Sequence, residues 1–270
     1  MKPKVYIAAH VPKEVEEYIG KYCEYRKWDS EEIIPYEKLR DEIKDSEGLV
    51  LFLRNVDSKL LEMTPNLKIV SNVSVGSNNF DITAMRERNI MGTNTPFVLD
   101  ETVADLVFGL MLSTARRIPE LDNYVRGGHW IGESDKQFYG ADVHHTTLGI
   151  IGMGRIGEQI ARRGKLGFNM DVQYYNRNRK IEIEKTIGVR FAEKEGLLKS
   201  SDFVVLMTPL NPNTEKLMGR NEFSLMKKTA FFINTSRGGT VDEDALIDAL
   251  KSHIIAGAGL DVFAQEPVAP

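Results

Sequence analysis

The first hundred residues alternate short apolar runs with stretches whose apolar residues recur at helical spacing. This pattern predicts strands at Lys4–Ala9, Gly48–Leu53 and Leu67–Asn72, and helices at Pro12–Gly20 and Asp81–Arg88. Strands that alternate with helices at this spacing are typical of βαβ units, which build a parallel sheet. The first part of the chain is therefore predicted to be an α/β domain.

A second alternating region follows a long helix. The helix is predicted over residues 99–117 because apolar residues recur there at 3-and-4 spacing, and residues 126–146, rich in Gly, His and Asp, are expected to form an irregular arm. Buried strands are then predicted at Thr147–Ile151, Met170–Tyr175, Phe203–Met207, Ala230–Asn234 and Ile254–Leu260. A boundary near residue 97 divides the chain into two predicted domains, 1–97 and 98–270.

Composition narrows the classes of protein to which the chain can belong. Its 270 residues suit two domains, and 42% hydrophobic with 27% charged residues allow a packed core. A formal net charge of -4 argues against binding to a nucleic-acid backbone, which requires a basic surface. Cys23 is the only cysteine, so an intrachain disulfide is excluded. Because neither a signal peptide nor an apolar run of membrane-spanning length is seen, we expect a cytoplasmic protein with no membrane partner.

The strongest motif is Gly152-Met153-Gly154-Arg155-Ile156-Gly157, which has the form G-x-G-x-x-G. It directly follows a predicted strand and opens an amphipathic helix predicted over Arg155–Leu166. In this context Gly152 permits a tight turn, Gly154 lets the backbone approach a pyrophosphate, and Gly157 lets the helix pack on the strand. The helix N-terminus adds N–H groups that favour phosphate. A purely structural glycine turn is the alternative, and the strand–turn–helix context favours dinucleotide binding.

The end of the next strand indicates which dinucleotide is bound. NAD-selective folds usually carry an acidic residue there, about 20 positions past the glycines, that binds the ribose 2′-hydroxyl. This chain has Asn176 at that position, followed by Arg177 and Arg179. An uncharged residue followed by arginines favours the 2′-phosphate of NADP(H), through charge-assisted hydrogen bonds. NADP(H) is therefore the preferred cofactor; NAD(H), with a solvated basic loop, stays an alternative.

A second group of polar residues follows later strands of the same predicted sheet. Thr235, Ser236 and Arg237 come directly after one strand, and Asp261 and Glu266 follow the next. Open α/β sheets bind their ligands at the carboxyl ends of the strands. These residues are therefore expected at one ligand-binding edge.

With these motifs, the chain resembles the D-isomer-specific 2-hydroxyacid dehydrogenases, and most closely their glyoxylate/hydroxypyruvate reductase branch. The resemblance extends over nearly the whole chain and is carried by five blocks in order. The blocks are LKIVSNVSVGSNNFD (67–81), TNTPFVLDETVADL (93–106), LGIIGMGRIG (148–157), NTSRGGTVDE (234–243) and GLDVFAQEP (259–267). Five ordered blocks at compatible spacing are far more specific than a single motif.

The resemblance implies two doubly wound domains with the active site in the cleft between them. A flavodoxin-like substrate domain would comprise residues 1–97, without its usual C-terminal return, and a Rossmann dinucleotide-binding domain would comprise residues 98–270. Family members commonly dimerise through the long helix and the arm after it. Residues 99–146 are therefore expected to form a homodimer surface, with Trp130 either an interface anchor or packed within its own chain.

The resemblance also implies roles for single residues. Arg237 matches the catalytic arginine that binds the substrate carboxylate and the reacting oxygen, and its guanidinium fork suits an oxo acid. Glu266 matches the acid that charges a catalytic histidine, and Val75 and Gly76 match the loop whose N–H groups receive the carboxylate. No metal site is expected. Further cofactor contacts are expected at Thr102, Arg155, Ile156, Thr208, Pro209, Thr235, the adjacent Ser236, and Asp261.

Two departures from the family pattern stand out. The family's catalytic histidine lies shortly beyond the position that matches Pro267, and none of the five histidines in the chain fits its role. We therefore expect a C-terminally truncated form of a longer enzyme, which retains dinucleotide affinity and loses most of its turnover. Arg54 lies where the family has a wall of the substrate pocket, and a surface role is favoured over selection of acidic substrates.

The predicted activity is reduction of a small 2-oxo acid, of the glyoxylate or hydroxypyruvate type, to the D-2-hydroxy acid by hydride transfer from NAD(P)H. A non-catalytic, dinucleotide-sensing scaffold on the same fold is the alternative from another class of protein. The presence of Arg237 and Glu266 disfavours it, because a scaffold needs neither. Oxidation of phosphoglycerate or formate, as in other branches of the family, is a further alternative.

Overall fold

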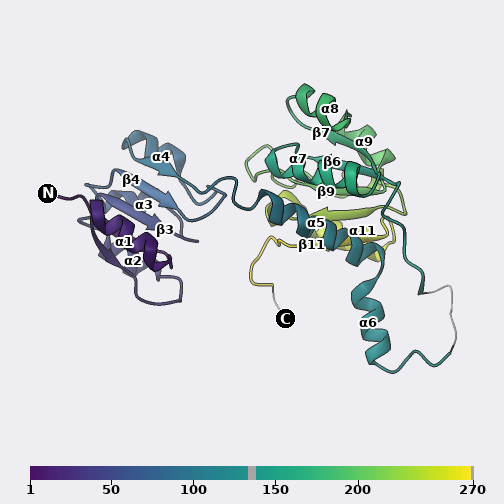
Figure 1. Cartoon of the computed structure of the whole chain (residues 1–270), viewed down its shortest axis with the longest axis horizontal. Helices are drawn as coiled ribbons and strands as arrows, with labels where there is room; N and C mark the ends of the chain where they lie inside the picture. The colour runs from purple at the N-terminus through teal and green to yellow at the C-terminus, as the bar shows by residue number, and fades with distance from the viewer. Residues whose placement is uncertain (133–137, 269–270) are drawn as a thin grey trace. The chain divides into compact units, whose positions relative to one another are not determined.

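The chain folds into two compact units, each built around its own parallel sheet. The computed structural model describes residues 1–132 and 138–268. Unit 1 comprises residues 1–99 and unit 2 comprises residues 100–270 (Figure 1). The unit 1 sheet has five strands and the unit 2 sheet has six. Every strand-to-strand pairing within these two sheets is parallel, so in each sheet the carboxyl ends of the strands share one edge.

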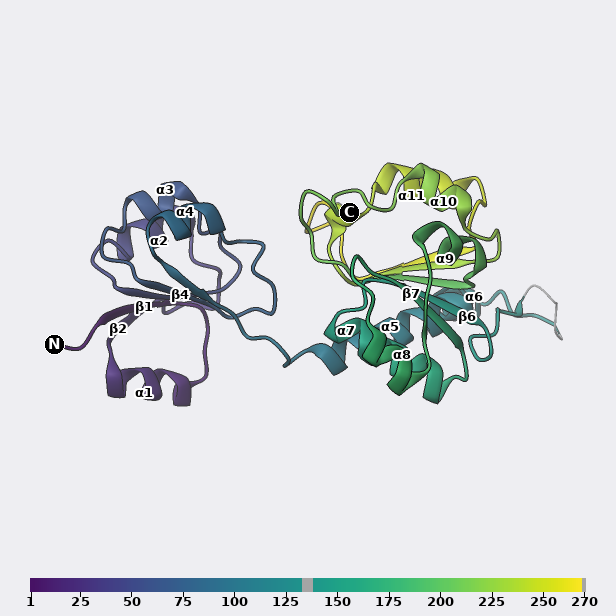
Figure 2. The same ribbon diagram turned by 90° about the horizontal axis from the view of Figure 1, so that it is seen from above.

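Unit 1 has helices on both faces of its sheet. Its elements are β1 (Lys4–Ala8), α1 (Lys13–Tyr22), β2 (Glu24–Lys27), α2 (Tyr36–Glu42), β3 (Gly48–Leu51), α3 (Ser58–Glu62), β4 (Ile69–Asn72), α4 (Ile82–Glu87) and β5 (Met91–Thr93). The strand order is β2-β1-β3-β4-β5, the order of flavodoxin-like folds. Helix α1 covers one face of the sheet, and α2, α3 and α4 cover the other (Figure 2). This topology confirms the doubly wound fold predicted for the first part of the chain.

Packing and capping together hold the short helices of unit 1. Leu39 of α2 and Leu60 and Leu61 of α3 are fully buried in the core beneath the sheet. The carboxylate of Asp57 accepts a hydrogen bond from the Leu60 N–H at 2.9 Å and so caps α3. Asp81 caps α4 in the same way, at 3.0 Å from the Ala84 N–H. Such caps satisfy N–H groups that a short helix otherwise leaves without partners.

Unit 2 is a six-stranded Rossmann fold. Its elements are α5 (Asp100–Ala115), α6 (Ile118–Arg126), β6 (Thr147–Ile151), α7 (Arg155–Arg162), β7 (Asp171–Tyr175), α8 (Ile181–Ile187), β8 (Arg190–Phe191), α9 (Lys194–Ser200), β9 (Phe203–Leu206), α10 (Arg220–Leu225), β10 (Phe231–Asn234), α11 (Glu243–Lys251) and β11 (Gly257–Leu260). The strand order is β11-β10-β9-β6-β7-β8. Counted within the unit this is the Rossmann order, and the order reverses between β6 and β9. Ligands of such sheets bind outside the carboxyl ends of the strands at this switch point.

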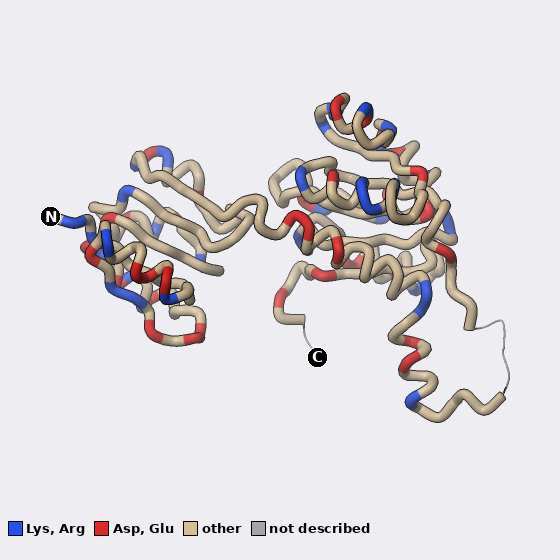
Figure 3. The backbone as a smooth tube through the Cα atoms, in the orientation of Figure 1, with Lys and Arg blue, Asp and Glu red and all other residues tan. Residues whose placement is uncertain are grey.

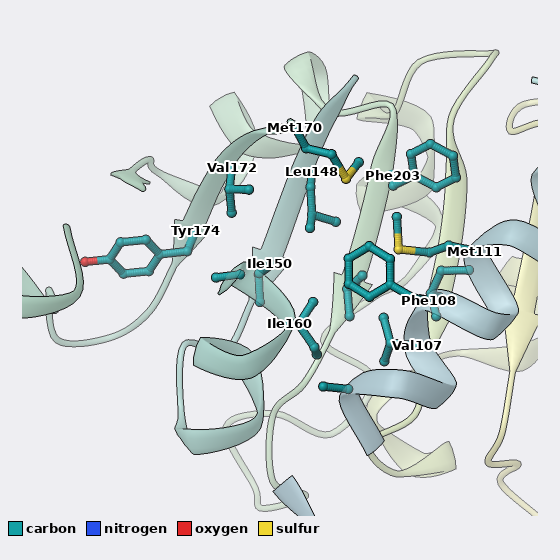
Figure 4. Packing of buried hydrophobic residues seen from close by; sticks show 14 of the residues in the cluster. Val107, Phe108, Met111, Leu148, Ile150, Ile160, Met170, Val172, Tyr174 and Phe203 are labelled. Carbon is teal, nitrogen blue, oxygen red and sulfur yellow. The ribbon is translucent and has the colours of Figure 1, made fainter. Parts of the chain in front are cut away.

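Two apolar layers enclose the unit 2 sheet. On one face, Val107, Phe108 and Met111 of α5 pack with Ile160 of α7 against the strands (Figure 4). Phe108 also stacks on Phe168, with 4.8 Å between the ring centroids. The other face is covered by α9, α10 and α11, whose apolar residues form a second buried cluster (Figure 2). With both faces covered, the strands read as continuous apolar runs, which explains why the sequence predicted them well.

Every strand predicted from the sequence is present, although several are shorter than predicted. The sequence did not predict the edge strands β2, β5 and β8, because their residues are mostly exposed and lack an apolar pattern. The helix predicted over 99–117 ends at Ala115, because Arg117 takes a left-handed conformation with φ 56. Helix α6 then starts, with Pro119 in its first turn.

The helix after the glycine motif also ends earlier than predicted. Helix α7 ends at Arg162, and a π-helical turn follows over Arg163–Gly167. The turn seats Gly164 against β6, where an added Cβ would lie 2.8 Å from the Leu148 Cδ2. Among the residues that the structure describes, no helix is both long and apolar enough to cross a membrane.

Candidate active site

The turn between β6 and α7 depends on backbone contacts that only glycine allows. Gly152 has φ 109, and an added Cβ there would overlap the carbonyl oxygen of Met207. An added Cβ at Gly157 would overlap the carbonyl oxygen of Gly152, so the first turn of α7 lies directly on the turn before it. Both glycines therefore have the steric roles that the motif predicted.

Gly154 has a different environment from the other two glycines of the turn. It precedes the first residue of α7, and no atom lies within 4 Å of the position that its Cβ would take. The space in front of the α7 N-terminus is thus open to a group that approaches the backbone. A pyrophosphate suits such a position, because helix N–H groups and the helix dipole favour negative charge.

Two threonine hydroxyls lie at the same edge of the sheet without a partner. Thr208 follows β9 and Thr235 follows β10, and both belong to the predicted cofactor contacts. The Oγ1 atoms of both are buried and make no hydrogen bond within the described part of the chain. Buried hydroxyls without partners are uncommon and costly. The open glycine turn and these hydroxyls together fit a dinucleotide, whose phosphate and ribose oxygens would supply the missing partners.

Arg155, the first residue of α7, is held by an acid from another helix. Its Nε lies 3.1 Å from a carboxylate oxygen of Asp100, the buried first residue of α5. The other Asp100 oxygen is buried and has no partner among the described residues. Arg163, the residue directly after α7, pairs with Glu101 and Asp105, and Figure 3 shows the acidic residues gathered at the start of α5. Helix α5 is thereby fixed to the helix that carries the phosphate turn.

The remaining contacts predicted around the turn lie at the same end of unit 2. Thr102 is exposed on the first turn of α5, Ile156 is half-buried on α7, and Pro209 is exposed in the loop after β9. Ile156 also packs against the apolar cluster between α5 and the sheet. Thr102 and Pro209 are exposed to solvent at this end of the unit.

The two arginines after β7 have different surroundings. The guanidinium of Arg179 forms a bidentate pair with Glu184 of α8, at 2.7 and 2.6 Å, and lies 5.9 Å from the Phe191 ring centroid. The Tyr174 hydroxyl donates to the same carboxylate at 2.8 Å. Arg179 and Tyr174 hold the pKa of Glu184 well below its usual range, at about 2. Arg177 is exposed and makes no hydrogen bond or ion pair among the described residues.

The turn that carries Arg237 is shaped by the buried side chain of Asn234. The Asn234 Oδ1 accepts hydrogen bonds from the N–H and the hydroxyl of Ser236, at 3.0 and 2.8 Å. The Asn234 amide donates to the Arg237 carbonyl at 3.2 Å. Arg237 is exposed beyond this turn, and its Nη1 donates to the Ser236 carbonyl at 2.6 Å. Ser236 is buried in the turn, and its hydroxyl stabilises the turn through the hydrogen bond to Asn234.

The loop after β11 packs directly on the Arg237 turn. An added Cβ at Gly238 would overlap the Phe263 carbonyl group, so the two backbones touch. The Glu266 carboxylate accepts a hydrogen bond from the Phe263 N–H at 2.9 Å, which folds the acid back onto its own loop. Partial burial, and to a lesser extent the nearby Glu266, raise the pKa of Asp261. Arg237, Asp261 and Glu266 thus occupy adjoining loops at one edge of the sheet.

The predicted substrate loop belongs to unit 1. Val75 and Gly76 are half-buried in the loop that follows β4. Arg54, in the loop after β3, donates from its Nε to the Ile34 carbonyl at 2.6 Å. Arg54 is thus half-buried and bound to the backbone of unit 1, and it is not the solvated surface arginine favoured from the sequence.

Known proteins with similar sequences show to which family the chain belongs. A family model described as D-isomer specific 2-hydroxyacid dehydrogenase, NAD binding domain, matches residues 108–270. A glyoxylate reductase from Pyrococcus horikoshii is 45% identical over 272 residues, which cover 99% of this chain and 81% of that protein. Glyoxylate/hydroxypyruvate reductase B from Escherichia coli is 48% identical over 224 residues, which cover 83% of this chain and 69% of that protein. The chain belongs to the D-isomer specific 2-hydroxyacid dehydrogenase family.

A solved structure supports the assignment to the D-isomer specific 2-hydroxyacid dehydrogenases. It is that of an NADPH-dependent glyoxylate/hydroxypyruvate reductase from Sinorhizobium meliloti in complex with NADP and malonate. That protein is 30% identical to this chain, with a TM-score of 0.84 over 100% of this chain and 82% of the other. The family resemblance and the α/β fold predicted from the sequence are confirmed, as is a nicotinamide dinucleotide as cofactor. The protein is an NAD(P)-dependent D-2-hydroxyacid dehydrogenase.

Sequence reasoning missed three residues that organise the site of this dehydrogenase. Asp100 could have been noticed as an acid in the first turn of α5, although nothing in the sequence pairs it with Arg155. Glu184 lies five residues after Arg179, but its role depends on the bend of the loop between them. Asn234 was identified only as the end of a strand. In each case the partner is set by tertiary structure, so no spacing rule could have found it.

Replacing Glu184 by glutamine is expected to lower the melting temperature at pH 7 and to lose this effect in acid. A carboxylate whose pKa is lowered stabilises the folded state above its unfolded pKa, about 4.3. This stabilisation declines as the pH falls from there toward the folded value of about 2. Thermal melts of wild type and Glu184→Gln at pH 7, 5, 4 and 3 measure the difference. Glu182→Gln, an exposed change on the same helix, is the control, and a Glu184 effect of constant size down to pH 3 would contradict this account.

Proposed function

We propose that the protein reduces a small 2-oxo acid, glyoxylate or hydroxypyruvate, to the D-2-hydroxy acid with NADPH as the preferred hydride donor. The observation that carries the proposal is the joint presence of the glycine turn, Arg237 and Glu266 at one sheet edge, in a chain whose relatives are named glyoxylate reductases. Unit 1 serves as the substrate domain and unit 2 as the dinucleotide domain. The single cysteine supports a cytoplasmic location.

The residues of unit 2 hold the dinucleotide in this proposal. The N–H groups at Gly154 and the guanidinium of Arg155 bind the pyrophosphate, and the hydroxyls of Thr208 and Thr235 find partners on it. The rest of the surface that contacts the dinucleotide is formed by Thr102, Ile156, Pro209, Ser236 and Asp261. When bound, the reduced dinucleotide supplies the hydride. Because its pKa is raised, Asp261 is protonated at a higher pH than an ordinary aspartate, and this removes a negative charge from the surface as the pH falls.

Arg237 is the residue that binds and polarises the substrate in this proposal. Its planar fork binds the substrate carboxylate and the carbonyl oxygen, and so stabilises negative charge that develops on that oxygen. The Val75 and Gly76 N–H groups are further donors for the substrate carboxylate, as the family resemblance implies. Glu266 has the role of charging a proton-donating imidazole and raising its pKa, as the family resemblance implies. Since none of the five histidines in the chain fits that imidazole, turnover is measured on a version of the chain extended through the matching histidine.

The loop after β7 supports the preference for NADPH. Asn176 places no negative charge where a 2′-phosphate would bind, and its amide donates to the Asn178 carbonyl at 3.0 Å. Glu184 neutralises Arg179, whereas Arg177 keeps its charge exposed. Arg177 is therefore the stronger of the two predicted ligands for a 2′-phosphate, and Arg179 shapes the loop around it.

Helix α6 and the residues after it support a homodimer. No residue of α6 is buried, and the helix extends away from the body of unit 2 (Figure 1). Ile118 and Val125 on α6 are 54% and 52% exposed, and Trp130 beyond it is 64% exposed. A hollow of about 540 Å³ lies at the base of α6, between the end of α5 and the β10 and β11 strands. An exposed apolar arm beside a hollow fits association with a second copy, in which Trp130 serves as an interface anchor.

Arg237→Lys is expected to lower kcat/KM for glyoxylate by about 10²- to 10³-fold, because lysine keeps the charge but loses the fork that stabilises the reacting oxygen. NADPH affinity, measured by fluorescence titration, should stay within about twofold. Arg220→Lys, a change at a surface ion pair with Asp248 in the same unit, is the control and should leave turnover unaltered. Equal turnover in Arg237→Lys and wild type would rule out the role given to Arg237.

Arg177→Gln is expected to weaken NADPH binding by about 10- to 100-fold and to leave NADH binding unaltered, because a charge-assisted hydrogen bond to the 2′-phosphate is lost. Titration of both dinucleotides against the variant and wild type gives the ratio directly. Arg190→Gln, on the neighbouring strand β8, is the matched control. A parallel loss for NADH and NADPH would show that Arg177 does not discriminate between them.

Val125→Glu is expected to convert a dimer into a monomer, because it introduces a charge into the apolar surface of α6. Light scattering coupled to size-exclusion chromatography measures the mass of wild type and variant at equal concentration. Leu166→Glu is the control, since Leu166 is 73% exposed in another part of unit 2. A wild-type protein that is monomeric at all concentrations refutes the dimer.

A further inference from the structure

The loop that follows β4 has three successive carbonyl groups fixed by hydrogen bonds. The Ser74 carbonyl accepts from the Thr95 N–H at 3.0 Å. The Val75 carbonyl accepts from the side-chain amide of Asn94 at 2.8 Å. The Gly76 carbonyl accepts from the side-chain amide of Asn72, also at 2.8 Å. The orientation of each peptide group in the loop is therefore set by a donor outside the loop.

These bonds also set the direction of the N–H groups. In a planar trans peptide, the N–H of one residue points opposite to the carbonyl of the residue before it. The Ser74 and Val75 carbonyls both point toward the segment formed by Asn94 and Thr95. The N–H groups of Val75 and Gly76 consequently both point away from that segment, in a common direction.

The N–H groups aimed in this way are available as donors. The N–H groups of Val75 and Ser77 make no hydrogen bond within the described part of the chain. The Gly76 N–H has only the hydroxyl of Ser74 as acceptor, at 3.2 Å. A carboxylate oxygen is a stronger acceptor than a hydroxyl, since charge-assisted hydrogen bonds are shorter and about twice as strong. An arriving carboxylate can therefore displace the Ser74 hydroxyl.

A pair of amide side chains anchors the far end of the loop. Asn72, which is 3% exposed, donates to the Asn79 Oδ1 at 3.0 Å. The Asn79 amide donates in turn to the Arg54 carbonyl at 2.8 Å. Arg54 is bound to the Ile34 carbonyl, so the loop after β4 is tied through two side chains to the loop after β3. The Asn79 amide also donates to the Asn72 Oδ1, at 3.3 Å. Rotation of the buried Asn72 amide would leave its polar atoms unsatisfied, so this pair favours one geometry.

We propose that Asn94 and Asn72 are positioning residues that aim the Val75 and Gly76 N–H groups at the substrate carboxylate. This inference rests on the proposed function, since it names the residues that make the carboxylate-binding loop competent. Neither asparagine touches the substrate. Each acts through a carbonyl that it holds, so its loss affects carboxylate affinity rather than the hydride transfer itself.

The test compares Asn94→Ala with wild type by calorimetric titration of oxamate, a carboxylate analogue of glyoxylate, in the presence of saturating NADPH. Asn94 is exposed, so its replacement leaves the core intact. The variant is expected to bind oxamate about 3- to 10-fold more weakly, the usual effect of one hydrogen bond. The KM for glyoxylate should rise by a similar factor with kcat within about twofold, because the carboxylate is held alike in ground and transition states.

A matched control lies one residue earlier. Thr93 is exposed on β5 and donates to the Ser71 hydroxyl at 3.0 Å, without reaching any carbonyl of the loop. Thr93→Ala should leave oxamate affinity and KM within about twofold of wild type. Asn94→Asp provides a second variant, because a carboxylate cannot donate to the Val75 carbonyl and adds negative charge, so it should weaken oxamate binding further than alanine does.

The outcomes separate this inference from the function on which it rests. Three results would each overturn the positioning role. They are equal oxamate affinity in Asn94→Ala and Thr93→Ala, a loss of kcat in Asn94→Ala without a rise in KM, and no oxamate binding by wild type. A different result would refute the proposed function and leave the positioning role intact. In that case oxamate binds with the expected differences between wild type and variants, but wild type turns over neither glyoxylate nor hydroxypyruvate.

Discussion

Direct contact between backbones at the carboxyl edge of the unit 2 sheet is the constraint on which the rest of the site depends. Gly152 lies on the Met207 carbonyl, Gly157 lies on Gly152, and Gly238 lies on the Phe263 carbonyl group. These contacts join the loop after β6 to the loop after β9, seat α7 on its own turn, and join the loop after β10 to the loop after β11. A single added methyl group at any of the three would push these backbones apart. The backbone thereby sets the distance from the glycine turn to the Thr208 loop, and from the Arg237 turn to the Glu266 loop.

Acidic side chains hold two arginines of this edge before any ligand arrives. Asp100 binds Arg155 and Glu184 binds Arg179, and each pair links two helices or a loop and a helix. A guanidinium held in place loses less freedom when an anion binds, which favours binding. The same pairing cancels part of the positive charge. Arg177 is exposed and has no such acidic partner among the described residues, so its positive charge is available for the 2′-phosphate contact proposed above.

The sequence predicted those parts of the fold and site that depend on local pattern. Buried strands such as β6 and β9 stand out as apolar runs, and the glycine turn stands out because its context is a strand and a helix. The exposed edge strand β5 has no such pattern. The roles of Asn72, Asn94 and Asn234 also escaped prediction, because each of these amides binds a backbone carbonyl whose position only the folded chain defines.

The proposed function has the two units bind anions by the same physical means. In unit 2 the backbone at Gly154, before the N-terminus of α7, is open to the proposed phosphate. In unit 1 the N–H groups of Val75 and Gly76 point away from Asn94 and Thr95, toward the proposed carboxylate. Main-chain donors bind an anion without adding a full positive charge, and they cannot be lost by substitution of their own side chains. Their direction must instead be fixed by other groups, which are glycine contacts in unit 2 and asparagine amides in unit 1. In the proposed function the backbone carries the general affinity for anions, and the arginines take the tasks that need a formal charge: Arg177 selects the 2′-phosphate, and Arg237 stabilises the oxygen on which charge develops.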